Sequence, residues 1–85
     1  MDGQELTRRM REALESVIGT ISIEINDGTT FEQQLGMDYL DLYEYEMTLE
    51  EEFNIDIENE QGADEALTFG ELKAVVGRKL KEAGR

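Results

Sequence analysis

The side chains of this sequence that could take part in chemistry are carboxylates and a few hydroxyls. Neither histidine nor cysteine occurs among the 85 residues, so the usual general base, the commonest metal ligand and the thiolate nucleophile are all missing. Acid–base catalysis by carboxylates needs two of them in a cleft with shifted pKa values, and no pattern among the 21 acidic residues marks such a pair. A chain this short also offers little room for a cleft. We therefore expect no enzymatic activity.

The acidic clusters do not have the spacing of a calcium-binding loop. An EF-hand loop needs oxygen ligands at fixed steps around a glycine and a glutamate at its twelfth position. Counting around Gly28 or around Gly62 places an isoleucine at the first ligand position. Neighbouring carboxylates such as Glu50, Glu51 and Glu52 could bind divalent ions only weakly and without specificity. We therefore predict no metal site.

A helix is expected to position most of these groups, and it should begin at about Tyr39 and end at about Phe53. Gly36 interrupts the chain before it, and Asp38 can cap the free N–H groups of its first turn. Asp41 adds negative charge where the helix dipole favours it. Four apolar residues then recur at helical spacing and should face a core: Leu42, Tyr45, Leu49 and Phe53.

A second apolar stripe lies on another side of the same predicted helix. It consists of Leu40, Tyr43 and Met47, and acids surround it at Glu44, Glu50 and Glu51. A domain of this size cannot bury both stripes. We therefore predict that the second stripe is a partner-binding surface.

Other segments predict further helices around a single core. Residues 4–18 carry apolar residues on one face, and Gly19 should end that helix. Thr68 and Glu71 form a capping box that should open a last helix reaching about Glu82. A short helix is expected around 63–67. Ile21, Ile23 and Ile25 alternate with polar residues, but no second segment could pair with them as a strand.

The segment from Leu35 to Phe53 resembles the second helix of acyl carrier proteins, which carry substrates on a phosphopantetheine arm. The resemblance rests on Leu-Gly-x-Asp-x-Leu-Asp, followed by x-x-Glu-x-x-Met-x-Leu-Glu-Glu-Glu-Phe. It implies an all-α fold, a small four-helix bundle with a long first loop and a short third helix, formed by residues 1–85 as one domain. In that bundle the isoleucines of the first loop would plug one end.

The residue that holds the arm in this family differs here. The family signature is Asp-Ser-Leu, and its serine hydroxyl carries the arm, whereas this chain has Asp38-Tyr39-Leu40. A tyrosine oxygen lies roughly 4 Å farther from the backbone than a serine oxygen, behind a rigid ring, and misplaced geometry costs several powers of ten in rate. No other hydroxyl follows the required aspartate, so we expect no cofactor. Tyr39 would instead cover the mouth of the bundle, enter a partner's pocket, or pack beside Leu40 and Tyr43. Glu46 stands where the family prefers an aliphatic residue, which indicates a more polar interior.

The charge distribution indicates the kind of partner. The formal net charge is −13, and every charge between Arg11 and Lys73 is negative. Such a field repels nucleic acid and anionic membranes and speeds encounter with a basic protein surface. The basic residues all lie towards the two ends: Arg8, Arg9, Arg11, Lys73, Arg78, Lys79, Lys81 and Arg85. No apolar run is long enough to span a bilayer, and the N-terminal residues lack the features of a signal peptide. A monomeric cytoplasmic protein is therefore expected.

The sequence thus favours an acyl-carrier-like protein that docks on a basic surface of a biosynthetic or acyl-transferring enzyme. By analogy with the family, the docking residues would be Asp38, Leu40, Asp41, Tyr43, Glu44, Met47 and Glu51. Two alternatives stay open. One is a working carrier of fatty-acid, polyketide or related biosynthesis, whose serine was replaced or whose phosphopantetheine sits elsewhere. The other is an acidic decoy that mimics nucleic acid.

Overall fold

Three helices form most of the chain, and they are connected by two long segments. The computed structural model describes residues 1–58, 60, 62, 63 and 65–84. The helices are α1 (Gly3–Ile18), α2 (Tyr39–Phe53) and α3 (Phe69–Glu82). No strand occurs in these residues, which contain one isolated bridge between Thr30 and Thr68. The predicted all-α class is confirmed, and so are the positions of these three helices to within about one residue.

The expected short helix around 63–67 is not found among the described residues. Asp64, in the middle of that prediction, lies outside them. Ala63 N–H donates to the Glu60 carbonyl at 3.2 Å, and Ala66 N–H donates to the Ala63 carbonyl at 3.3 Å. These are separate three-residue turns, and the positive φ of 94° at Gly62 is incompatible with a helical residue. The described part of the chain therefore has three helices and not four.

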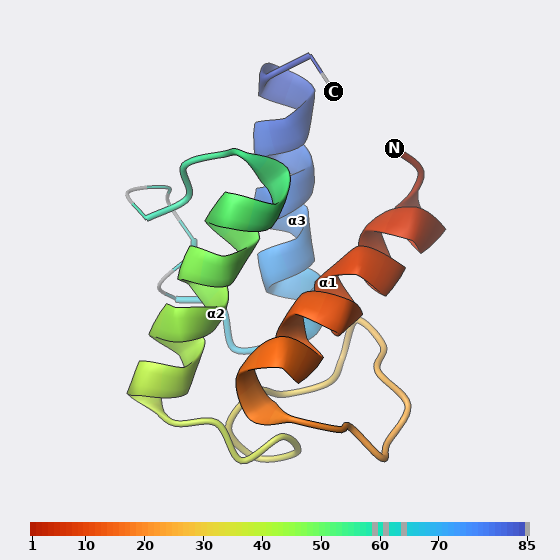
Figure 1. Cartoon of the computed structure of the whole chain (residues 1–85), viewed down its shortest axis with the longest axis vertical. Coiled ribbons are helices and arrows are strands. Elements are labelled where there is room, and N and C mark those ends of the chain that lie inside the picture. Colours follow the sequence, from red (N-terminus) through yellow and green to blue (C-terminus); the bar gives the residue numbers. More distant parts are fainter. Residues whose placement is uncertain (59, 61, 64, 85) are drawn as a thin grey trace.

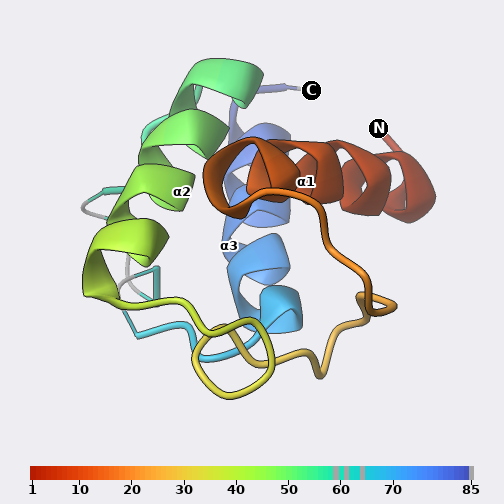
Figure 2. The same cartoon turned by 60° about the horizontal axis from the view of Figure 1, so that its bottom comes forward.

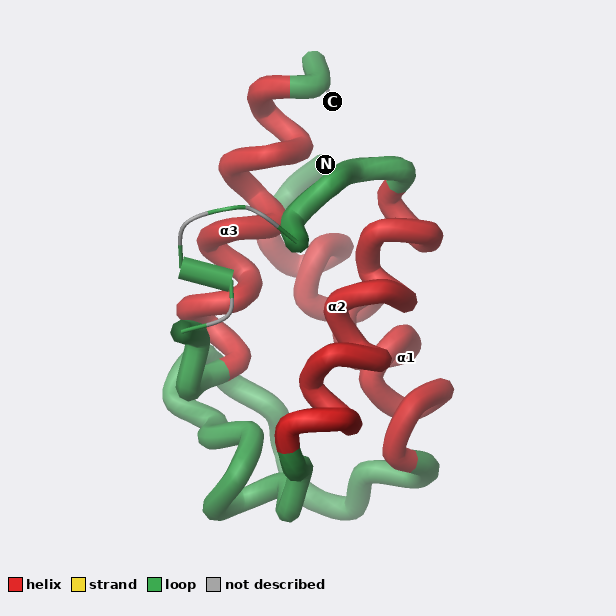
Figure 3. The backbone as a smooth tube through the Cα atoms, turned by 90° about the vertical axis from the view of Figure 1, so that its left-hand side faces the viewer, coloured by secondary structure: helices red, strands yellow, loops and turns green. Residues whose placement is uncertain are grey.

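The helices stand side by side, with α1 running opposite to α2 and α3 (Figure 1). The first connection, residues 19–38, folds beneath one end of the bundle, as Figure 2 shows. The second connection leaves α2 at the other end, and its last described residues, 65–68, lead into the start of α3 (Figure 3). In the part of the chain that the structure describes, no helix is long and apolar enough to cross a membrane.

Each helix begins at a side-chain cap. Asp2 accepts from Glu5 N–H at 2.8 Å, and Thr68 accepts from Glu71 N–H at 3.2 Å. The complete capping box lies at α2, where Asp38 accepts from Asp41 N–H at 2.9 Å and Asp41 accepts from Asp38 N–H at 3.2 Å. At α3 the Glu71 carboxylate accepts the Thr68 hydroxyl at 3.1 Å. The reciprocal pair that the sequence predicted for α3 is therefore seen at α2.

The core is built from one face of each helix and from apolar residues of both connections. On α2 the predicted stripe is buried at Tyr45, Leu49 and Phe53, whereas Leu42 is only partly covered. The other helices contribute Leu6, Met10, Ala13, Leu14, Phe69, Leu72, Val75, Val76 and Leu80. The connections add Ile21, Ile25, Phe31, Met37, Ile57, Ala63 and Ala66.

The core position of Tyr45 and the packing of the first connection can now be described. As a core residue Tyr45 could still have kept its hydroxyl in contact with solvent, but the hydroxyl donates to the Met10 carbonyl at 2.9 Å inside the core. The ring of Tyr45 packs edge-on against Phe31, with centroids 6.0 Å apart. The three alternating isoleucines were expected to plug the bundle together, but only Ile21 and Ile25 are buried, and Ile23 is exposed. A regular extended segment would place all three on one face, so this segment does not have the geometry of a strand.

The first connection is attached to the start of α3 by backbone hydrogen bonds. Phe69 N–H donates to the Thr29 carbonyl at 2.9 Å, Gly70 N–H donates to the Asp27 carbonyl at 2.9 Å, and Phe31 N–H donates to the Leu67 carbonyl at 3.1 Å. The loop thus supplies acceptors for N–H groups that the first turn of a helix cannot satisfy itself. This attachment fixes residues 27–31 beside the start of α3.

Candidate functional site

The predicted docking residues lie on one exposed face of α2 and at its cap. Leu40, Tyr43 and Met47 follow one another at helical spacing, and 64%, 44% and 43% of their surfaces are exposed. Asp38, Glu44 and Glu51 are also exposed, and Asp41 is half-buried. We call these seven residues the α2 face. The structure brings all of them together, because they come from a single helix whose opposite side is occupied by Tyr45, Leu49 and Phe53.

The acids of the α2 face are not used in ion pairs with the described basic residues. Arg9 pairs with Glu52 at 2.8 Å and stacks over the Phe53 ring at 4.5 Å. Lys79 pairs with Glu60 at 3.4 Å, and the Glu60 carboxylate raises the Lys79 pKa. The other described pairs are Arg8 with Glu5 and Glu12, Arg11 with Glu15, Lys73 with Asp27, Arg78 with Glu60, and Lys79 with Glu82. These six basic residues pair with acids outside the α2 face, so the face keeps its negative field.

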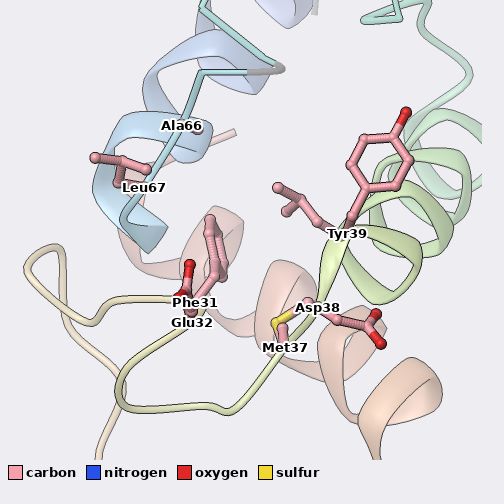
Figure 4. A pocket seen from close by; sticks show the side chains of 8 residues that line it. Phe31, Glu32, Met37, Asp38, Tyr39, Ala66 and Leu67 are labelled. Atoms are coloured by element: carbon pink, nitrogen blue, oxygen red, sulfur yellow. The ribbon is translucent and has the colours of Figure 1, made fainter.

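Tyr39 stands at the first position of α2, directly after its cap. Its side chain is 82% exposed, so it neither covers the end of the bundle nor is buried beside Leu40 and Tyr43. Figure 4 shows the hydroxyl directed away from Phe31 and Met37. An exposed ring with a polar tip is typical of a residue that contacts another molecule. Of the readings proposed from the sequence, contact with a partner is the one that this position favours.

A pocket beside the start of α2 was not anticipated from the sequence. It encloses about 440 Å³ between the first connection, the end of the second connection and α2 (Figure 4). Its lining consists of Phe31, Glu32, Met37, Asp38, Tyr39, Leu42, Ala66 and Leu67. These residues come from three separate segments, and Phe31 and Leu67 meet only because their backbones are hydrogen-bonded. Local periodicity could not have revealed such a site.

Glu46 lies on the buried side of α2, at the position where the family that the sequence resembles prefers an aliphatic residue. Only 7% of its surface is exposed, although most acidic residues of the chain are on the surface. A carboxylate in this place makes the interior beside α2 more polar than an aliphatic residue would. This agrees with the inference drawn from the sequence.

A phosphopantetheine arm in the family that the sequence resembles is held by a short, exposed hydroxyl after the aspartate. In this chain the phenol ring of Tyr39 stands at that place. The Ser16 hydroxyl donates to the Ala13 carbonyl at 2.6 Å, and the Thr48 hydroxyl donates to the Glu44 carbonyl at 2.9 Å, both along their own helices. Ser22 is exposed but lies in the first connection, away from the cap of α2. None of the described hydroxyls has the required position.

Comparison with known proteins identifies the family. The family model described as "Phosphopantetheine attachment site" matches residues 8–80. An acyl carrier protein of Solidesulfovibrio magneticus is 33% identical over 73 residues, covering 80% of this chain and 94% of the relative. An acyl carrier protein of Exiguobacterium is 32% identical over 80 residues, covering 94% of this chain and all of the relative. One from Chlamydia caviae is 42% identical over 55 residues, or 65% of this chain and 70% of the relative.

These matches agree with the three-helix architecture and with the motif at the start of α2. Proteins of this kind carry substrates for biosynthetic enzymes, interact with them and are not themselves catalysts, which supports the prediction that the chain is not an enzyme. The chain belongs to the acyl carrier protein family.

Proposed function

We propose that this protein is an acyl-carrier-like docking protein that binds a basic surface of a biosynthetic or acyl-transferring enzyme through the α2 face. The observation that carries the proposal is the exposure of Leu40, Tyr43 and Met47 within a group of acids that the described basic residues leave unneutralised. Apolar side chains in this setting supply desolvated contact, and the acids steer the encounter.

The proposal includes the loss of the phosphopantetheine site. Tyr39 in place of a short hydroxyl is the reason, since the family's attachment chemistry requires a hydroxyl that a transferase can align with the phosphate of coenzyme A. The protein would then occupy a partner without delivering a substrate. We further propose that residues 1–85 form one domain, that the protein is monomeric and cytoplasmic, and that its negative charge prevents binding to nucleic acid or to anionic membranes.

Association kinetics test the docking proposal. Suitable basic probes are a phosphopantetheinyl transferase and a ketosynthase, since both classes bind acyl carrier proteins. The double variant Glu44→Lys/Glu51→Lys should reduce the association rate constant by about tenfold at low salt, and the difference should shrink as salt is added.

The matched control is Glu24→Lys/Glu65→Lys. Both of these residues are exposed and lie outside α2, and the pair changes the net charge by the same amount. It should reduce the rate much less. Equal effects of the two double variants would mean that only the total charge matters, and an unchanged rate for Glu44→Lys/Glu51→Lys would refute docking through the α2 face.

A further inference from the structure

A small pocket on the side of α2 combines aromatic walls with carboxylates. It encloses about 120 Å³ and is lined by Tyr39, Tyr43, Glu46, Met47, Glu50 and Glu58. Tyr39, Tyr43 and Met47 are spaced by four residues and form one wall, with Glu46 and Glu50 on the next row of the helix. We call this site the α2 side pocket.

The carboxylates of the pocket are held in place by the fold. Glu46 is almost fully buried, so its position is fixed by packing. Glu50 accepts hydrogen bonds from Ile57 N–H at 2.8 Å and from Glu58 N–H at 3.0 Å, which attaches the segment after α2 to the helix. The same two bonds place Glu58 at the rim of the pocket. None of the residues lining the pocket is basic.

We propose that the α2 side pocket receives a cationic side chain of the partner protein, an arginine. This rests on the proposed docking function and names the contact chemistry that the partner must supply. A guanidinium can stack on the tyrosine rings and donate to the carboxylates in the same pose. Its positive charge also lies beside the Glu46 carboxylate, where burial makes a Coulomb attraction less screened than on the open surface.

Other occupants suit the pocket less well. Its volume of about 120 Å³ is well below that of sites for cofactors and metabolites, which are about 300–1,000 Å³. The carboxylates of the described residues form no cluster with the geometry of a metal site. A second copy of this chain would bring another net charge of −13 to an acidic surface. A single positively charged side chain fits both the size and the charge.

Titration of the isotope-labelled full chain with acetyl-Gly-Arg-Gly-amide, followed by NMR, tests the proposal. The arginine peptide should shift the resonances of Tyr39, Tyr43, Met47 and the Glu46 carboxyl group in a saturable way. The matching peptide with citrulline, which is uncharged and nearly the same size, should bind about tenfold more weakly. A lysine peptide should fall between the two, because it lacks the planar fork.

Protein variants locate the effect. Glu46→Gln should weaken binding of the arginine peptide about tenfold. Glu24→Gln, at an exposed residue outside both the pocket and the α2 face, should change it by less than about twofold. Tyr43→Leu should weaken binding, because the ring that a guanidinium stacks on is lost, and should stay folded, because Tyr43 lies outside the buried core. Shifts spread evenly over the acidic surface, equal binding of citrulline, or a Glu46→Gln variant that binds like the natural chain would overturn the proposal.

These results are independent of the docking kinetics. If the arginine peptide does not occupy the pocket while Glu44→Lys/Glu51→Lys still slows association with a basic enzyme, only the pocket proposal fails. If the pocket binds the peptide but the charge reversals leave association unchanged, the pocket does bind arginine and docking through the α2 face fails.

Discussion

Two glycines of α3 should respond in opposite directions to replacement by alanine. Gly70 lies against the first connection, and a Cβ atom there would be 2.6 Å from Asp27 Cβ, 2.7 Å from the Asp27 carbonyl oxygen and 3.0 Å from Asp27 Cα. Two of these atoms belong to the backbone, so a side-chain rotation cannot relieve the clash. At Gly77 the nearest atom would be Leu6 Cδ2 at 3.8 Å, which is an ordinary van der Waals contact.

The magnitudes follow from three opposing effects. Alanine in place of glycine in a helix stabilises by up to about 1 kcal/mol. At Gly70, overpacking costs about 1–3 kcal/mol and weakening of the Gly70 N–H to Asp27 carbonyl bond costs a further ~1 kcal/mol. Gly70→Ala should therefore lower the free energy of unfolding by about 1–3 kcal/mol, whereas Gly77→Ala should raise it by about 0.5–1 kcal/mol.

Urea unfolding followed by circular dichroism at the helix band measures both changes. In a domain of this size, 1 kcal/mol corresponds to about 4–8 °C in Tm, so thermal unfolding separates the two variants easily. A Gly70→Ala variant as stable as the natural chain would refute the close contact between residue 27 and the start of α3. A destabilised Gly77→Ala variant would refute the packing between α1 and α3.

Two further predictions concern the core and its edge. Burial raises the pKa of Tyr45, so the phenol stays protonated in the folded state. Stability should therefore fall as the pH rises above about 10, where the unfolded chain loses this proton. In urea unfolding at alkaline pH, Tyr45→Phe should make this loss of stability less steep, and an equally steep loss would contradict the burial of the hydroxyl. Arg9→Ala removes both the ion pair with Glu52 and the stacking on Phe53 and should lower the free energy of unfolding by about 1 kcal/mol. Glu52→Gln leaves the stacking in place and should lower it by less. Equal losses in thermal unfolding would show that the contact with the Phe53 ring contributes nothing.

Much of the fold could be predicted because local signals agree with it. Asp38, Thr68 and Gly19 mark helix boundaries that the structure reproduces, and the apolar spacing of α2 separates its buried side from its exposed side. The resemblance of residues 35–53 to a known family added the long first connection. The exposure of Leu40, Tyr43 and Met47 followed from the argument that one short helix cannot bury two stripes.

The parts that could not be predicted depend on contacts between distant residues. The hydroxyl of Tyr45 is satisfied by a carbonyl 35 positions earlier, and the pocket beside Phe31 exists because residues 29 and 31 are hydrogen-bonded to residues 69 and 67. The α2 side pocket likewise needs Glu58, which the Glu50 carboxylate holds in place. The periodicity of apolar residues within one segment carries no information about contacts between distant segments. Ala63, Ala66 and Leu67 do have helical spacing, but a segment of five residues is too short for this spacing to specify a helix.

On the proposed function, this chain keeps the recognition helix of a carrier but lacks the group that the helix presents in the family. Intact mass after incubation with coenzyme A and a phosphopantetheinyl transferase is the decisive measurement. The natural chain should keep its mass, Tyr39→Ser should gain the mass of the arm, and Tyr39→Ser combined with Glu44→Lys/Glu51→Lys should gain it more slowly. A gain of the arm by the natural chain, or an unchanged mass for a folded Tyr39→Ser variant, would contradict the account.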